Sequence, residues 1–360
     1  MSDWTDAPST HLVDRLTPVP LAERGAIKAG PADKATHDSH FDALPLFRQV
    51  EIGGAPPRRD AIEQSARVVF WNTERLRHLD AIADSLAALR PDVMLLCEID
   101  RGMARSGNTD RVVEIATSLD AGYAYSVEFL ELDLGDIHEK RIHAGETNAD
   151  GLHGAAILTD VAMARPFVIR IDRRGDWFDG ARHEPRVGGT IAVGAEIIVA
   201  GVPVLMVNVH LESHDNPVAR GEDMRRLLTQ IDLLAPGGAV ILGGDFNTST
   251  FALRDRPIDA DRWAEIFAAD PHRMLRPQSY EPLFKIAASF GYDTAGCNVP
   301  DRPTTRRPLG DPRPLAKIDW FFTRGLAVTD PQIIAAVRDT GEPSSDHEGL
   351  LVTVAPLGRV

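Results

Sequence analysis

Polar residues that could bind a metal ion or a phosphate stand at the ends of four apolar runs in this sequence. An apolar run is typical of a buried strand, where a terminal carboxylate is costly unless it is paired or bound to a cation. Loops at strand ends are also where a rigid scaffold places its reacting groups. The runs and their residues are RVVFW with Asn72, VMLLC with Glu98, VLMVNV with His210, and AVILGG with Asp245 and Asn247.

Two later segments add residues of the same kinds. KID supplies Asp319, and SSDHE supplies Asp346 and His347. The combined set of carboxylates, amides and imidazoles, without a cysteine cluster, favours Mg²⁺ or Mn²⁺ over structural zinc. A divalent ion can neutralise and orient a phosphate, and amide and imidazole donors can stabilise its other oxygens. We therefore expect one or two Mg²⁺ or Mn²⁺ ions and a phosphate ester as the substrate.

Each of these residues also has a plainer interpretation when it is taken alone. Glu98 could form a strand-end ion pair, His210 could be a core histidine, and Asp245 could cap a turn made tight by Gly243 and Gly244. The plain interpretations become improbable together, because the residues stand at successive strand ends.

The elements that must position these residues are both strands and helices. Strands are expected at 67–72, 93–98 and 239–247, the last running into a glycine-rich turn, and two long neighbouring strands at 188–213. Helical spacing marks 76–89, and an amphipathic helix is expected over 217–235. Strand pairs and strand-helix-strand units together indicate an α/β fold, with sheets packed face to face and helices outside.

Residues 1–62 differ from the rest in being rich in proline and without a clear period. They read either as a partly disordered N-terminal extension or as an arm that wraps the body, covers the site or contacts a second copy. Residues 63–360 are expected to form the catalytic domain. The sequence does not indicate an oligomeric state.

Charge and composition narrow the function classes. The net charge of -14 disfavours unspecific nucleic-acid binding, which usually needs a basic stripe. Cys97 lies in an apolar run and reads as a buried thiol, although pairing with Cys297 stays open. The N-terminus lacks the pattern of a signal peptide, and no stretch approaches a membrane span, so a cytoplasmic protein is expected.

The ordered motifs resemble the endonuclease/exonuclease/phosphatase superfamily, which includes DNase I-like nucleases, inositol polyphosphate 5-phosphatases and neutral sphingomyelinases. The resemblance covers about residues 66–355 and implies a four-layer α-β-β-α sandwich with two mixed sheets. The matching segments are VVFWNTE, PDVMLLCEID, GAAILT, LMVNVHLES, VILGGDFNT, AKIDWFF and SSDHEGLLV.

The resemblance also implies roles for the matching positions. Glu98 would be the principal metal ligand, helped by Asn72 and Asp346. Asp245 would orient or deprotonate the attacking water, and Asn247 and His210 would hold phosphate oxygens. His347 would contact the scissile phosphate or transfer a proton, with Asp319 fixing its tautomer. Either Asp245 or His347 could be the general base of an in-line attack by water.

Three further residues are assigned to substrate binding: Arg186, His153 and, within LMVNVHLES, Asn208. The chain departs from nucleases of the apurinic type, because no tyrosine lies between GAAILT and NVHLES. We therefore expect a small-molecule, lipid-headgroup or nucleotide phosphoesterase. The alternative is a DNA or RNA nuclease, and a non-catalytic binding module ranks last because every main position is filled.

Overall fold

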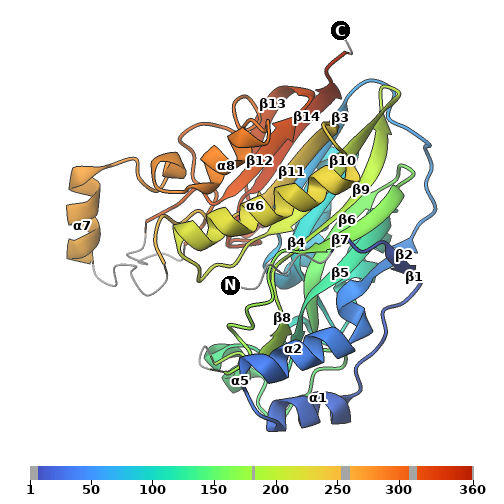
Figure 1. Ribbon diagram of the computed structural model, residues 1–360, viewed down its shortest axis with the longest axis vertical. Coiled ribbons are helices and arrows are strands. Elements are labelled where there is room, and N and C mark those ends of the chain that lie inside the picture. Colours follow the sequence, from blue (N-terminus) through green and yellow to red (C-terminus); the bar gives the residue numbers. More distant parts are fainter. Residues whose placement is uncertain (1–6, 181–182, 253–259, 308–313, 359–360) are drawn as a thin grey trace.

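Two β-sheets packed face to face form the centre of the protein, and helices cover their outer faces (Figure 1). The computed structural model describes residues 7–180, 183–252, 260–307 and 314–358. This arrangement confirms the expected four-layer α-β-β-α sandwich.

The larger sheet mixes parallel and antiparallel pairs. Its path begins at the N-terminal strands and ends at β13, while β8 (Arg186–Gly188) pairs with β5 beside this path. In spatial order the path is β1 (His11–Val13), β2 (Gln49–Gly54), β5 (Gly122–Glu131), β6 (Leu152–Thr159), β4 (Val93–Arg101), β3 (Ala66–Asn72), β14 (Gly349–Pro356) and β13 (Leu326–Ile334).

The smaller sheet contains the two long strands that the sequence predicted. β9 (Ile191–Val199) and β10 (Val202–His210) form an antiparallel hairpin, which turns at Ala200 and Gly201 with positive φ at both. β10 then pairs in parallel with β11 (Ala239–Asp245), and β12 (Asp319–Arg324) and β7 (Ala164–Arg170) complete the edges.

Close packing between the two sheets explains why a glycine stands at position 243 in the AVILGGD run. Gly243 and Gly244 lie inside β11, not in a turn, so the expected glycine-rich turn before Asp245 is wrong. A Cβ atom on Gly243 would lie 2.7 Å from Phe321 and 2.9 Å from Leu95. The glycine therefore lets the two sheets approach closely.

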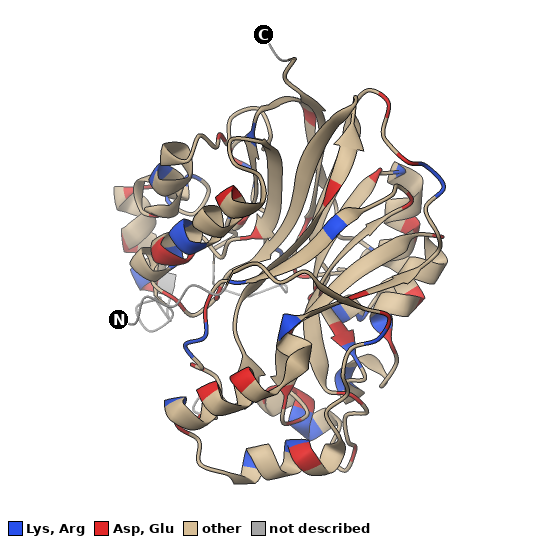
Figure 2. Cartoon of the chain, turned by 45° about the vertical axis from the view of Figure 1, so that its right-hand side comes forward, with Lys and Arg blue, Asp and Glu red and all other residues tan. Residues whose placement is uncertain are grey.

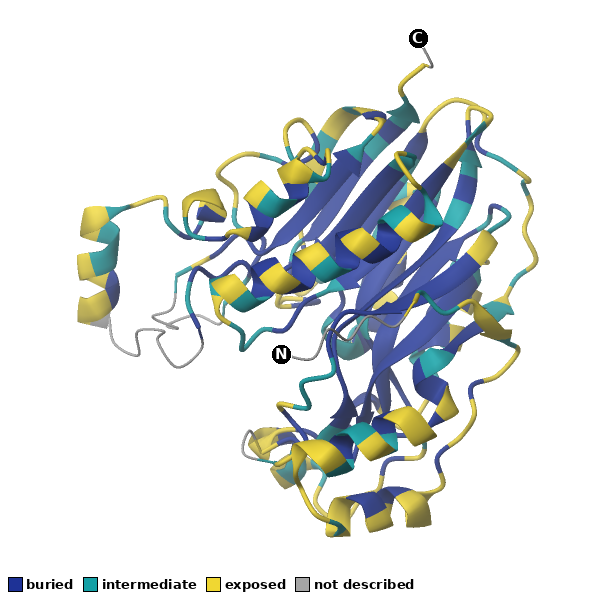
Figure 3. Cartoon of the chain, viewed as in Figure 1, coloured by how far each residue is buried: buried dark blue, intermediate teal, exposed yellow. Residues whose placement is uncertain are grey.

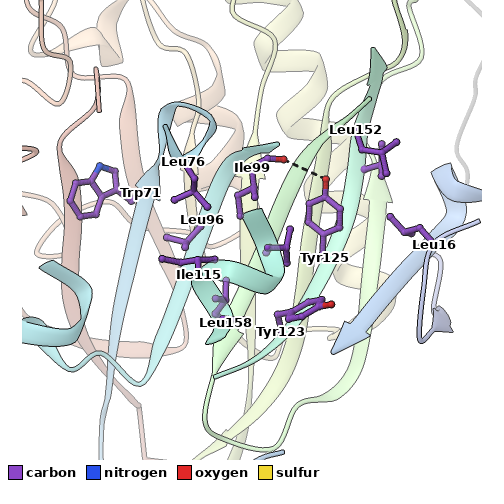
Figure 4. Packing of buried hydrophobic residues seen from close by; sticks show 14 of the residues in the cluster. Leu16, Trp71, Leu76, Leu96, Ile99, Ile115, Tyr123, Tyr125, Leu152 and Leu158 are labelled. Carbon is purple, nitrogen blue, oxygen red and sulfur yellow. Dashed lines mark hydrogen bonds between the residues drawn. The ribbon is translucent and has the colours of Figure 1, made fainter. Parts of the chain in front are cut away.

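Helices pack their apolar faces on both outer surfaces. α6 (Pro217–Leu234) and α8 (Leu283–Ser289) cover the smaller sheet, and α3 (Leu79–Leu89) and α4 (Arg111–Ser118) lie on the larger sheet. Figure 3 shows buried positions along the strands and exposed ones on the outer side of α6. In the cluster under α3 and α4, the Tyr125 hydroxyl also donates to the Ile99 carbonyl (Figure 4).

The N-terminal segment contributes regular structure of its own. β2 pairs with β5 of the larger sheet, and β1 pairs with β2. α1 (Leu21–Ala29) and α2 (Lys34–Ala43) lie between these two strands in the sequence.

Both cysteines, Cys97 and Cys297, are buried free thiols. None of the described helices is long and apolar enough to cross a membrane. The remaining elements are α5 (Ile137–Ile142), α7 (Ala260–Ala269), and 3-10 turns at Pro45–Arg48, Glu74–Leu76, Ala104–Ser106 and Pro277–Ser279.

Candidate active site

Neighbouring strands of the smaller sheet bring three of the predicted residues into register. His210 of β10 lies opposite Asp245 of β11, which lies opposite Asp319 of β12. From the larger sheet, Glu98 of β4 faces the same cavity, whose volume is about 310 Å³. The predicted residues that line this cavity are Glu98, His153, Arg186, His210, Asp245, Asn247, Asp346 and His347.

A β-bulge turns Glu98 toward the cavity. The pairing of β4 with β6 shifts between Leu96 and Ile99, and Glu98 adopts a left-handed backbone with a φ of 52°. A non-glycine residue is strained in this region, and such strain persists where the surrounding structure imposes it. Bulges commonly redirect side chains beside active sites.

Asn72 joins the carboxylates of the two sheets. Its Nδ2 atom donates to Glu98 Oε1 at 2.9 Å and to Asp245 Oδ2 at 3.1 Å. Its Oδ1 atom accepts the backbone N–H of Glu74 at 3.2 Å. Asn72 is fully buried and lies behind the cavity lining, so its amide holds two acidic groups side by side.

The two carboxylates differ in how their charge is compensated. Burial raises the pKa of Glu98, but His210, His153 and Arg75 outweigh it and lower the value to about 2. Burial, with the negative charge of Asp319, raises the pKa of Asp245 to about 6. Asp245 therefore has the character of a group that can accept a proton near neutral pH.

His210 is oriented by a carboxylate that the sequence does not distinguish. Its Nδ1 atom lies 2.9 Å from Glu128 Oε2 on β5, and its Nε2 atom lies 3.9 Å from Asp245 Oδ2. Burial lowers the pKa of an imidazole, yet Glu128 raises that of His210 to about 10. An Nε2–H group is thereby directed toward Asp245.

His347 forms a similar pair with Asp319, which is fully buried. Its Nδ1 atom lies 3.0 and 2.9 Å from the two Asp319 oxygens, and its Nε2 atom lies 3.8 Å from Asp245 Oδ2. Although burial opposes protonation, Asp319 raises the pKa of His347 well above its usual value. Asp245 is therefore flanked by two imidazoles, each fixed through its Nδ1 atom.

Hydrogen bonds fix the loop that carries His347. The Ser345 hydroxyl donates to the Asn72 carbonyl at 2.8 Å and accepts the backbone N–H of His347 at 3.1 Å. The Trp71 indole donates to the His347 carbonyl at 2.9 Å. Asp346 stands between these anchored residues, half exposed at the cavity.

Asn247 follows Asp245 in a tight, locally satisfied turn. Its backbone N–H donates to Asp245 Oδ1 at 2.9 Å, and its side-chain amide donates to the Leu211 carbonyl at 2.8 Å. Asn247 has a φ of 48°, which asparagine tolerates better than most residues. This turn fixes the carboxylate of Asp245 in the cavity wall.

The donor set at this site fits a divalent cation. Ligand atoms of Asp245, Asp319 and His347 lie within 4.8 Å of one another. Asp319 already engages the His347 imidazole in this group, so the carboxylates of Glu98 and Asp346, which line the same cavity, are the ligands left for the ion. Buried carboxylates crowded in this way need positive charge, and oxygen-rich sets suit Mg²⁺ or Mn²⁺.

Arg186 lies in the cavity wall between two aromatic rings. Its guanidinium carbon is 3.7 Å from the Trp177 ring centroid and 4.1 Å from that of Phe129. It also pairs with Glu131 at 3.3 Å and with Glu184 at 3.8 Å. Its positive charge is therefore already compensated by protein carboxylates.

His153 belongs to a third histidine–carboxylate pair at the cavity. Its Nδ1 atom lies 2.8 Å from Asp100 Oδ1, and Asp100 pairs in turn with Arg105 at 2.9 Å. Asn208 is placed differently, because its buried amide donates to the carbonyls of Leu96 and Ala156. Asn208 thus ties the two sheets together and does not line the cavity.

The carboxylates that orient these histidines were not predicted from the sequence. Glu128 and Asp100 lie inside strand-like runs, where alternation alone gives no reason to distinguish them. Glu74 could have been predicted as a site residue, because it stands two residues after Asn72. Its carboxylate accepts the backbone N–H of Asp346 at 3.0 Å. Burial and the charge of Asp346 raise the pKa of Glu74.

Comparison with known proteins points to one family. A model of the Endonuclease/Exonuclease/phosphatase family matches residues 69–347. A search of curated protein sequences found no match.

Solved structures share the fold at low sequence identity. The human Nocturnin catalytic domain with bound sulfate has a TM-score of 0.54 and 15% identity, covering 87% of this chain and 98% of that one. An endonuclease/exonuclease/phosphatase from Beutenbergia cavernae has a TM-score of 0.52 and 17% identity, covering 82% and 72%. A conserved protein from Enterococcus faecalis has a TM-score of 0.50 and 15% identity, covering 81% and 100%.

Proposed function

The chain belongs to the endonuclease/exonuclease/phosphatase family, whose members are generally phosphoesterases or nucleases, and we propose that it hydrolyses a phosphate ester with a divalent metal ion. The proposed substrate is a phosphodiester or phosphomonoester of a small molecule, lipid headgroup or nucleotide. The ion is Mg²⁺ or Mn²⁺, held by Glu98 and Asp346 with Asn72 beside them. When bound, it neutralises phosphate charge and polarises the leaving oxygen.

The observation that carries this proposal is the position of Asp245. Its carboxylate lies between the Nε2 atoms of His210 and His347, at 3.9 and 3.8 Å, and it accepts a hydrogen bond from Asn72. Asp245 orients a water molecule and accepts its proton, which its raised pKa favours. The Nε2–H groups of the two imidazoles stabilise the oxygens of the phosphate as charge develops on them.

The choice between Asp245 and His347 as general base follows from their protonation. His347 beside Asp319 is held in its charged form, so it has no lone pair available to take a proton. It serves as a hydrogen-bond donor and, in its charged form, as the acid that can protonate a leaving oxygen. Asp245 is the proposed base.

The charges around the cavity favour a compact substrate over a polymer. Six carboxylates line it, and three of the four lining arginines, Arg75, Arg105 and Arg186, pair with protein carboxylates. Acidic and basic residues also alternate along the elements of the chain, and neither kind is confined to one part of the ribbon (Figure 2). A polyanion therefore gains little from the cavity beyond the metal site, whereas a single phosphate can be held there. The six carboxylates are Glu98, Glu128, Glu184, Glu212, Asp245 and Asp346.

A panel of substrates and metals tests this proposal. Wild-type protein is incubated with Mg²⁺, Mn²⁺ or EDTA and with bis-p-nitrophenyl phosphate, p-nitrophenyl phosphate, nucleotides, phospholipids or plasmid DNA. We expect metal-dependent release of product from at least one small ester, and none with Asp245→Ala or His347→Ala. Metal-dependent nicking of plasmid alone would favour a nuclease. Turnover that survives EDTA or both substitutions would overturn the proposed mechanism.

A further inference from the structure

One wall of the cavity comes from a segment that has little regular structure of its own. The three-residue strand β8 is the only regular element among the described residues of 171–189, which are 171–180 and 183–189, yet these residues supply Trp177, Glu184 and Arg186 to the lining. A segment of this kind needs contacts from elsewhere to keep a single conformation, because ordering its backbone costs conformational entropy. The N-terminal helix α2 lies beside it (Figure 1).

His37 of α2 makes the most specific of these contacts. Its side chain is fully buried, and its Nε2 atom lies 3.0 Å from the carbonyl oxygen and 3.2 Å from the amide nitrogen of Gly188. A Cβ atom on Gly175 would lie 2.7 Å from the imidazole ring. His37 therefore contacts residues near both ends of the 171–189 segment.

Further contacts with α2 hold the middle and the start of the segment. The ring of Phe178, next to Trp177, packs edge-on against His37 with centroids 5.5 Å apart. Arg173 pairs with Asp42 at 2.9 Å, and its guanidinium carbon lies 5.2 Å from the Phe41 ring centroid. The segment is thus held by ring packing, by an ion pair and by the bond to Gly188.

Helix α1 holds a second segment beside the cavity in the same way. The buried guanidinium of Arg24 donates to the carbonyls of Asn148 and Ala149 at 2.9 and 2.7 Å. Lys28 pairs with Asp133 at 2.8 Å. These contacts hold residues 132–151, where Glu139 of α5 pairs with the lining residue Arg105.

We propose that residues 7–54, which we call the N-terminal clamp, determine substrate specificity by fixing the 171–189 wall, with His37 as the positioning residue. The clamp lies outside the family match, which begins at residue 69. None of its described residues lines the cavity, so it acts through the wall and not by touching the substrate. This inference rests on the proposed function, because the wall belongs to the proposed substrate site.

Asp245 and His347 are held by parts of the fold that the clamp does not contact. Asp245 stands on β11, and His347 is anchored by Trp71 of β3, whereas the clamp and the wall pair with β5 through β2 and β8. Loosening the 171–189 wall therefore weakens substrate binding more than it slows the chemical step. A raised KM with little change in kcat is the expected signature.

Amide hydrogen exchange tests the clamp without any need for activity. His37→Phe keeps a ring in the pocket but removes the bond to Gly188, so we expect exchange in peptides from 171–189 to become at least tenfold faster. His37→Gln retains an amide that can reach Gly188 and should restore most of the protection. Ser39→Ala, at an exposed position of the same helix, should change nothing.

Two controls keep this result interpretable. Peptides covering 202–210 and 239–245 should exchange as in the wild type, because they belong to the smaller sheet. If His37→Phe does not fold, Asp42→Asn removes the ion pair to Arg173 at the surface and should speed exchange in 171–189 about twofold. Unchanged protection of 171–189 in the folded variants, or an equal loss over all peptides, would overturn the clamp.

Kinetics with bis-p-nitrophenyl phosphate then test its link to specificity. We expect His37→Phe to raise KM at least fivefold with kcat within twofold of the wild type, and His37→Gln to reverse most of the change. A fivefold fall in kcat with KM unchanged would contradict a specificity role. If the wild type turns over no ester, the proposed function fails, whereas the exchange result still decides whether the clamp holds the wall.

Discussion

Both carboxylate oxygens of Asp319 lie within 3.0 Å of the Nδ1 atom of His347. Asp319 is fully buried on β12 and does not line the cavity, so its contact with the reaction is through the imidazole. The pair directs Nε2–H of His347 toward Asp245 and holds its positive charge. Loss of this orientation should therefore affect the chemical step more than folding or binding.

The substitution Asp319→Asn tests this relationship. Asparagine keeps the volume but can donate an N–H to the imidazole, which favours the wrong tautomer and removes the compensating charge. We expect kcat to fall by about 10²–10⁴-fold, the range typical of general acid–base groups. Steady-state kinetics on the most active ester measure the effect, with circular dichroism as the folding control. A kcat within threefold of the wild type would exclude a role for the pair.

Removal of the metal should change stability as well as activity. The carboxylates that crowd the cavity repel one another unless a cation is present, so the folded state binds the ion and the unfolded chain does not. At a free concentration 100 times the Kd, the ion should stabilise the protein by about 2.7 kcal/mol. Thermal melts with EDTA and with added Mg²⁺ or Mn²⁺ measure this difference. Glu98→Gln should reduce the gain, and an equal gain in that variant would exclude Glu98 as a ligand.

The sequence located the cavity residues because three of them end apolar strands. Asn72, His210 and Asp245 are the last residues of β3, β10 and β11, and parallel pairing of β10 with β11 aligns His210 with Asp245. Glu98 instead lies within β4, where the bulge turns it toward the cavity. Local patterns sufficed for these positions.

The partners that orient those residues depend on packing across the fold. Glu128 meets His210 because β5 of one sheet crosses β10 of the other, a contact 82 residues apart in the chain. The N-terminal segment lacks a hydrophobic period, yet α2 is held by a buried histidine and by rings, which no periodicity analysis detects. Gly243 resembled a turn glycine, although its actual requirement is the close approach of the sheets.

The substitution Arg186→Ala tests whether Arg186 balances buried charge in the cavity wall or binds a substrate phosphate. Its guanidinium compensates Glu131 and Glu184 in the cavity wall, so Arg186→Ala leaves buried carboxylates with less positive charge. We expect the free energy of unfolding to fall by about 3 kcal/mol, and Glu184→Gln in the same chain to recover part of it. Urea denaturation measures both, with Arg225→Ala on the exposed face of α6 as the control. A rise in KM with unchanged stability would instead indicate a residue that serves the substrate alone.

A cluster of aspartates around Arg174 should make stability depend on pH. Arg174 faces Asp172, Asp176, Asp215 and Asp223, so negative charge is in excess. Burial, together with Asp223, raises the pKa of Asp215 to about 7. Between about pH 4 and pH 7, the Asp215 carboxyl is therefore protonated in the folded protein. In the unfolded chain, where its pKa is near 4, it has already lost that proton.

The sign follows from this difference in proton binding. Stability from Asp215 is fully present below about pH 4 and is lost as the pH rises through about 7. We expect Asp215→Asn to flatten the fall in unfolding free energy between pH 5 and 8, by about 1–3 kcal/mol. Urea denaturation at each pH measures the slope, and Asp232→Asn on α6 serves as the control. Identical slopes in the wild type and in Asp215→Asn would contradict the raised pKa.

The close approach of the two sheets at Gly243 should be intolerant of even one methyl group. A Cβ atom there would meet Phe321 of β12 and, from the facing sheet, Leu95 and Phe70 at 2.9 and 3.0 Å. These side chains are buried on all sides, so they cannot move away without disturbing their neighbours. We expect Gly243→Ala to lower the free energy of unfolding by about 1–3 kcal/mol. Gly25→Ala in α1, where nothing lies within 4 Å, should be neutral or slightly stabilising. Asp245 follows two residues later on the same strand, so kcat in Gly243→Ala should fall together with stability. A variant as stable and as active as the wild type would show that the sheets can separate there without cost.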